Sequence, residues 1–236
     1  MALSSRCLRY LALVATVLFM VLGVTAAVLQ CVFTLPMFSL LSVPPYLHVP
    51  LMVPLVPTLL AVPVGFFGLS AARNERMFKL LGVTCLQVLL SLALAVLAGW
   101  QVTLSFGARL EVDLRALMVF SLLEPKWHVV YHELRCCGVS GPASFEGSIP
   151  TACCVRDEVV ASSGPCSTLY STGCLAPASE QIRGVLRRAG AVNGGAAVLM
   201  FLCAVLSAVF VDSLKRAAQK RKELRLNHED TPLRSP

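Results

Sequence analysis

Two pairs of adjacent cysteines are the residues of this chain whose spacing says most about its chemistry. The first pair, Cys136 and Cys137, lies in ELRCCGVSG, and the second, Cys153 and Cys154, lies in PTACC. Adjacent cysteines rarely bridge each other, because the bridge would close a small strained ring and miss the usual Cα separation. Each of the four therefore needs a partner elsewhere in the chain.

Six of the ten cysteines lie within one segment, at Cys136, Cys137, Cys153, Cys154, Cys166 and Cys174. In an oxidising compartment they should pair as disulfides, although spacing alone leaves the connectivity open. Zinc is the alternative, since His128 and His132 lie four residues apart just upstream. Adjacent cysteines do not have the spacing of zinc knuckles, so we favour disulfides and expect both histidines on the exposed side of a helix.

The apolar composition of the chain indicates an integral membrane protein. Hydrophobic residues make up 56% of it and charged residues 14%, and the mean hydropathy is +0.74. Four stretches are long and apolar enough to span a bilayer, at residues 11–30, 51–72, 80–104 and 191–211. Arg6 and Arg9 precede the first stretch, as in a signal peptide, but its length and the lack of a small-residue cleavage site favour an uncleaved span.

The distribution of basic residues predicts the orientation. Twelve of the twenty Lys and Arg residues, against five acidic ones, lie in the N-terminal segment 1–10, the turn 73–79 and the tail 212–236. The loop 105–190 is neutral, with eight residues of each sign. The positive-inside rule then predicts that both termini are cytoplasmic and that this loop and the small loop 31–50 lie outside. The tail should attract anionic lipid rather than nucleic acid, because it contains no folded basic domain.

The loop 105–190 is large enough to be a domain, and its flanks have helical periodicity. Apolar stripes run through Leu110, Leu114, Leu117, Leu122 and Leu123, through Trp127, Val130, Tyr131 and Leu134, and through Ile182, Val185, Leu186 and Ala189. Residues 138–174 are rich in glycine and proline, so bridges rather than a core should hold them. The sequence thus predicts an all-α integral membrane protein, with four transmembrane helices and a disulfide-stapled, mainly helical large extracellular loop between spans three and four.

These motifs, in this order, resemble those of the tetraspanin family. They are CCG at residues 136–138, PTACC at residues 150–154, the single Cys166, and STGC ending at Cys174. The stretches CLRYLALVATVLFMVLG and GFFGLSAARNERMFKLLG resemble the family's first span and the end of its second span with the inner turn. The resemblance covers nearly the whole chain except the tail.

The resemblance implies roles for the cysteines and for the glycine of CCG. It implies the disulfides Cys136–Cys174, Cys137–Cys153 and Cys154–Cys166. Gly138 would supply a backbone turn unavailable to other residues. Cys7, just before the first span, is a possible palmitoylation site.

The chain departs from the family pattern inside the spans. It has Thr16 where the family commonly has Asn, and Ala95 and apolar residues around Met200 where the family has acidic or amide side chains. Gln87 and Asn193 are not at the expected places. We therefore expect an interhelical polar contact of the family to be missing, at a cost of only about 0.6 kcal/mol.

Other residues of the spans carry weaker expectations. The second span contains three prolines, Pro54, Pro57 and Pro63, which leave its shape open. Cys85 and Cys203 lie within spans and are expected to pack as apolar residues, whereas Cys31 has no assured partner. The small residues Gly65, Gly68, Gly194, Gly195 and Ala197 offer surfaces on which helices could approach closely.

The sequence predicts a binding protein rather than an enzyme. Its four histidines fall in different compartments, no nucleophile can be placed beside one, and no cofactor motif occurs. The resemblance implies a scaffold that gathers receptors and adhesion molecules laterally in the plasma or endosomal membrane, alone or with related proteins and with lipids, including sterol. The alternatives are a small multi-pass transporter, a sterol- or lipid-binding protein with a cavity lined by Gln87 and Thr16, and a photoreceptor disc-rim-type structural tetraspanin. A claudin-like protein is disfavoured, because its disulfide-bearing loop should come first.

Overall fold

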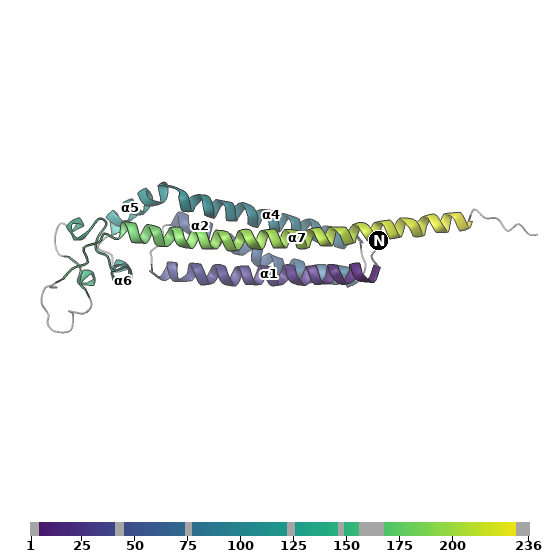
Figure 1. The fold of residues 1–236 in the computed structure, drawn as a ribbon, viewed down its shortest axis with the longest axis horizontal. Helices are drawn as coiled ribbons and strands as arrows, with labels where there is room; N and C mark the ends of the chain where they lie inside the picture. The colour runs from purple at the N-terminus through teal and green to yellow at the C-terminus, as the bar shows by residue number, and fades with distance from the viewer. Residues whose placement is uncertain are drawn as a thin grey trace, which may run out of the picture. The chain divides into compact units, whose positions relative to one another are not determined.

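The computed structural model of the chain describes residues 5–40, 45–73, 77–121, 126–145, 149–155 and 168–229. Within these ranges the fold is helical, with one isolated β-bridge, between Cys154 and Leu169, in place of a sheet. The helices are α1 (Ser5–Leu40), α2 (Pro45–Met52), α3 (Leu55–Arg73), α4 (Met77–Phe106), α5 (Arg109–Ser121), α6 (Lys126–Glu133) and α7 (Leu175–Glu229), and Figure 1 labels all of them except α3. Two 3₁₀ turns, Pro142–Ser144 and Thr151–Cys153, lie between α6 and α7.

Four helical stretches of the described residues are long and apolar enough to cross a membrane. They are Tyr10–Pro36, Val49–Arg73, Phe78–Phe106 and Leu175–Lys220. The chain between the third and fourth of them contains two disulfides. The predicted fold class, an all-helical membrane protein with four spans and a bridged loop between spans three and four, is confirmed.

The second span is interrupted, which answers the question that its prolines raised. α2 ends at Met52 and α3 begins at Leu55, with a turn between them. The N–H of Val53 still donates to the carbonyl of Val49 at 2.9 Å. Pro54 has no N–H, so it cannot bond the carbonyl of Pro50 as the next residue of a helix would. A break in a span is tolerated only where other groups bond the freed carbonyls.

The chain divides into two compact units, and unit 1 comprises Met1–Ala27, Leu55–Ala95 and Gly194–Pro236. Its buried side chains are mostly small, such as Ala12, Ala15, Ala61, Ala71, Ala72 and Ala204. Its exposed side chains are mostly large and apolar, such as Val14, Leu18, Phe66, Phe67, Leu89 and Leu202. Helices in lipid have no hydrophobic force between them and associate through small residues, so this arrangement is that of a bundle surrounded by lipid.

Glycines bring α1 and α3 close together in unit 1. A Cβ added to Gly23 would lie 2.6 Å from the Cβ of Ala61 and 2.8 Å from the carbonyl oxygen of Thr58. A Cβ on Gly68 would lie 2.8 Å from a methyl of Thr16. The expectation of small-residue contacts is therefore confirmed at Gly65 and Gly68, since both are buried against side chains of α1. It is wrong at Gly195, which is exposed and where an added Cβ would meet nothing within 4 Å.

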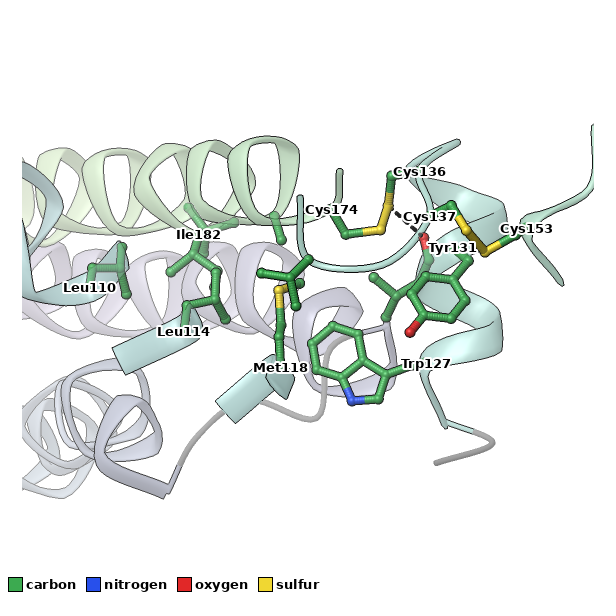
Figure 2. Close-up of a cluster of buried hydrophobic side chains, with 14 of the residues drawn as sticks. Leu110, Leu114, Met118, Trp127, Tyr131, Cys136, Cys137, Cys153, Cys174 and Ile182 are labelled. Atoms are coloured by element: carbon green, nitrogen blue, oxygen red, sulfur yellow. Dashed lines mark hydrogen bonds between the residues drawn. A yellow bond between two sulfur atoms is a disulfide. The ribbon is translucent and has the colours of Figure 1, made fainter. Parts of the chain in front are cut away.

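Unit 2 comprises Val28–Pro54 and Val96–Asn193, and it has a core of the kind found in water-soluble domains. The helical stripes predicted from the sequence meet in it, at Leu110 and Leu114 of α5, Trp127, Val130 and Tyr131 of α6, and Ile182, Val185 and Leu186 of α7. Met118, which was not predicted, is also in the core, whereas Leu117 and Leu134 are only partly buried against it. Figure 2 shows Leu114, Met118, Trp127 and Ile182 gathered beside the disulfides. Leu122 and Leu123 of the predicted stripe lie outside the described residues.

Candidate functional site

Two disulfides close the large loop. Cys136 is bonded to Cys174 and Cys137 to Cys153, with Cα separations of 5.0 and 5.1 Å. All four residues are 0% exposed, and Figure 2 draws both bridges in the same buried cluster as Tyr131. These are two of the three pairs that the resemblance implies. Cys154 is disulfide-bonded as well, but Cys166, its predicted partner, lies outside the described residues, so that pair stays a prediction.

Backbone hydrogen bonds join the CCG turn to the start of α7. The N–H of Cys137 donates to the carbonyl of Thr172 at 2.9 Å, and the N–H of Cys174 donates to the carbonyl of Gly138 at 2.8 Å. The N–H of Leu175 donates to the carbonyl of Val139 at 3.1 Å. The Cys136–Cys174 bridge lies within this pairing, so it fixes the residue before α7 to the turn that follows α6.

The Cys137–Cys153 bridge ties the CCG turn to a second segment of the loop. The N–H of Tyr170 donates to the carbonyl of Cys153 at 3.0 Å, so the chain around Cys153 also pairs with the segment that leads into α7. The adjacent Cys136 and Cys137 therefore fix the turn after α6 to two different parts of the loop. The resulting surface is preorganised, which reduces the ordering cost of binding.

Gly138 has the conformation that the sequence predicts for it. Its φ is +67°, and an added Cβ would lie 2.4 Å from the carbonyl oxygen of Gly141. The angle disfavours a side chain and the contact with a backbone oxygen excludes one, so only glycine fits. Gly173, on the facing segment, is equally crowded, because a Cβ there would lie 2.5 Å from the carbonyl oxygen of Val139.

An aromatic cluster supports the bridges. The ring of Tyr131 stacks on Trp127 with 6.5 Å between centroids and meets Phe145 edge-on at 6.3 Å. Burial disfavours the phenolate and raises the pKa of Tyr131 to about 12. The cluster is an apolar support for the loop rather than a reactive centre.

The remaining predicted residues are not brought to one place. His128 is exposed and His132 half-buried on α6, and no group of three His, Cys, Asp or Glu among the described residues could hold a metal. Cys203 is buried as expected, but Cys85 is exposed, so the expectation that it packs inside the bundle is wrong. Cys31 is a free, half-buried thiol, and the side chain of Cys7 lies outside the described residues.

The fold and the bridged loop agree with the comparison with protein families. The model of the Tetraspanin family matches residues 5–213. The chain belongs to the tetraspanin family. A search of curated proteins found no match. Tetraspanins are in general non-enzymatic membrane proteins that associate with other membrane proteins, so a scaffold role in the membrane follows at that level.

A ring of buried polar groups, which sequence reasoning missed, lies within unit 2 of this tetraspanin. The side-chain N–H₂ of Asn193 donates to Oε1 of Gln30 at 2.7 Å and to Oε1 of Gln101 at 2.9 Å. Gln30 Nε2 donates to the carbonyl of Leu51 at 2.7 Å, and Gln101 Nε2 donates to the carbonyl of Pro50 at 2.8 Å. All three amide side chains are 0% exposed. We call Gln30, Pro50, Leu51, Gln101 and Asn193 the polar ring.

The polar ring corrects the expectation that an interhelical polar contact is missing. Thr16 makes no such contact, since its hydroxyl donates to the carbonyl of Ala12 in its own helix. The ring instead joins α1, α4 and α7 to the break in the second span, where the carbonyl of Pro50 lacks a helical donor. The signal in the sequence was the proline at position 54 together with three amide residues near the loop-side ends of three spans.

A fourth buried amide differs from those of the polar ring, because its side chain has no hydrogen-bond partner. Gln87 of α4 lies in unit 1 and is 1% exposed, yet neither its Nε2 nor its Oε1 has a hydrogen-bond partner. A buried amide without partners is costly in an apolar environment. In the polar ring, by contrast, only Oδ1 of Asn193 lacks a partner.

Proposed function

We propose that this tetraspanin holds receptors and adhesion proteins in lateral complexes, with its large loop selecting the partners. The loop is extracellular, both termini are cytoplasmic, and the protein resides in the plasma or an endosomal membrane. The asymmetry of basic residues supports this orientation, because twelve Lys and Arg residues fall on the side of the termini. The disulfides support it too, since they persist in oxidising compartments.

The observation that carries the proposal is the contrast between a rigid loop and an adaptable span surface. The loop has its own core, with two fully buried bridges, so it can present a fixed shape to a partner. The described spans expose large aliphatic side chains on their outer faces, which lipid or another helix can cover. Selection would therefore reside in the loop, and lateral association in the spans.

A loop exchange tests the proposal. Residues 105–190 are replaced by the corresponding loop of another tetraspanin, and both proteins are purified in mild detergent with the proteins bound to them. We expect the exchanged version to lose most partners of the intact chain while it keeps related tetraspanins. Recovery of the same partners by both versions would exclude selection by the loop.

The orientation is tested separately by thiol labelling of intact cells. A membrane-impermeant maleimide should label the six loop cysteines only after extracellular reduction. An engineered cysteine in the tail 230–236 should remain unlabelled until the cells are permeabilised. Labelling of the tail in intact cells would contradict the orientation without bearing on partner selection.

Acylation of Cys7 is a finer part of the same proposal. The position of Cys7, near a membrane boundary, suits palmitoylation, which would strengthen lateral association. Cys7→Ser should abolish incorporation of a clickable palmitate analogue and leave the disulfides intact. Cys85→Ser, at a lipid-exposed position within a span, serves as the control and should not change incorporation.

A lipid-binding role is the second candidate, and the unpartnered amide of Gln87 favours it. A sterol hydroxyl could supply the missing hydrogen bond within the bundle. Sterol that co-purifies with the wild-type protein should then fall in Gln87→Leu. An unchanged sterol content would exclude this role.

A further inference from the structure

The hydrogen bonds of the polar ring form a closed circuit. From the carbonyl of Leu51 they pass through Gln30, Asn193 and Gln101 to the carbonyl of Pro50, which is covalently adjacent to Leu51. Asn193 has two side-chain N–H groups, and each is used on a different glutamine. Loss of any one bond therefore leaves at least one buried group unpaired and removes the orientation of its neighbour.

The surroundings of the ring make partly open states costly. The three amide side chains are 0% exposed, so no water can replace a broken bond while the helices stay packed. The carbonyl of Pro50 has no donor in its own helix, because Pro54 follows it by four residues. A state in which one hydrogen bond is broken is therefore higher in free energy, because a buried polar group loses its partner and no water replaces it.

We propose that the polar ring is an all-or-none latch, which holds the small-loop segment α2 against α1, α4 and α7 and opens only when water enters it. Water reaches Oδ1 of Asn193 first, since that atom is the one acceptor of the ring without a partner. Opening frees residues 49–55 together with the end of α1 next to Gln30. The latch concerns the chain's own motion and does not depend on which partners the large loop binds.

Amide hydrogen exchange of the full chain in lipid nanodiscs tests the latch, with two matched variants. Gln101→Leu and Gln87→Leu make the same substitution at buried positions of the same helix, one inside the ring and one outside it. We expect Gln101→Leu to speed exchange at residues 49–55 about tenfold, the factor for a membrane hydrogen bond of the stronger kind. Gln87→Leu should leave exchange there unchanged. Equal effects of the two variants, or none in either, would overturn the proposal.

A second readout follows the other side of the latch. In a background with Cys7, Cys85 and Cys203 replaced by serine, Cys31 is the free thiol beside Gln30. Its reaction with a water-soluble maleimide should accelerate in Gln101→Leu by the same factor as amide exchange. An increase in only one readout would indicate local fraying and contradict a latch.

Cooperativity is tested by a double-mutant cycle. Gln30→Leu, Gln101→Leu and the double variant should all exchange at similar rates, because the first substitution already opens the ring. Rates that multiply in the double variant would show four independent bonds and overturn the latch. Where a leucine variant fails to form the loop disulfides, Asn193→Asp replaces it, since it keeps the shape but removes both donated bonds.

Discussion

The two units of the chain bury opposite kinds of side chain. In unit 1 the interior consists largely of alanine, glycine and small polar residues, with a few large side chains such as Phe19, Leu94 and Met200, and most of the large aliphatic residues face outward. In unit 2 the core between α5, α6 and α7 contains Leu114, Met118, Trp127 and Tyr131, closed by two disulfides. Water drives large apolar groups inward, whereas lipid does not, so the composition of each interior reports the solvent around it.

The difference also decides what stabilises each unit. Unit 1 depends on close backbone approach, as at Gly23, where there is no room for a methyl group. Unit 2 depends on apolar burial and on covalent links, because the described chain between α6 and α7 contains only short 3₁₀ turns and one β-bridge. Substitutions of one type should therefore have unequal effects in the two units, and four experiments test this.

The largest effect is expected from removal of the Cys136–Cys174 bridge, which closes a sequence separation of 38 residues. The double variant Cys136→Ser, Cys174→Ser should lose about 4 kcal/mol in the chain-entropy model, enough to unfold the loop. Loss of Cys137–Cys153, with a separation of 16, should cost about 3 kcal/mol. Protease resistance of the loop in detergent is the measurement, and the spans of unit 1 should keep their helical circular dichroism.

A large-to-small substitution comes next. Leu114→Ala removes a side chain that is 1% exposed in unit 2 and should cost about 3 kcal/mol. Leu89→Ala removes the same atoms from a position of α4 that is 61% exposed and should change stability by less than about 0.5 kcal/mol. Thermal midpoints in detergent compare the two, and similar losses would mean that α4 does not face lipid at Leu89.

A small-to-large substitution should destabilise unit 1 where its helices are in close contact. Gly23→Ala places a methyl group 2.8 Å from the carbonyl oxygen of Thr58 and should cost about 1–3 kcal/mol in unit 1. Gly82→Ala meets nothing within 4 Å and should be neutral or should stabilise α4 by up to about 1 kcal/mol. The same thermal assay measures both, and a neutral Gly23→Ala would rule out the close packing of α1 on α3.

The smallest effect is a pH dependence that belongs to unit 2 alone. The pKa of Tyr131 is raised from 10.0 to about 12 by burial, so below pH 10 both the folded and the unfolded state are protonated and stability is full. Between pH 10 and 12 only the unfolded state loses its proton, so stability falls as pH rises, by about 1 kcal/mol between pH 10 and 11. Denaturation of the loop followed by tryptophan fluorescence should show this fall, and Tyr131→Phe should abolish it.

The sequence predicted what depends on local pattern. The stripes at Leu110, Trp127 and Ile182 follow from helical periodicity, and the role of Gly138 follows from the CCG motif. Their positions in the core were predictable because one buried face per helix is enough to fix them.

The polar ring and the state of Cys85 were not predictable in the same way. The ring joins Gln30, Gln101 and Asn193 across sequence separations of up to 163 residues, and one of its acceptors is the backbone carbonyl of Pro50, which a proline four residues later leaves without a helical donor. Cys85 was expected to pack as an apolar residue, but membrane helices are apolar all round, so hydropathy does not say which face is buried. The polar ring and the exposure of Cys85 both depend on how the helices pack against one another.

The complete burial of Cys136, Cys137, Cys153 and Cys174, which form two of the bridges, has a kinetic consequence. Thiol–disulfide exchange requires a thiolate to reach a sulfur atom, and none of Cys136, Cys137, Cys153 or Cys174 is accessible in the native loop. A mild reductant must wait until the loop opens by itself, so at high reductant concentration the rate of bridge loss becomes independent of that concentration. The rate of reduction would then equal the rate at which the loop opens spontaneously in a cell membrane.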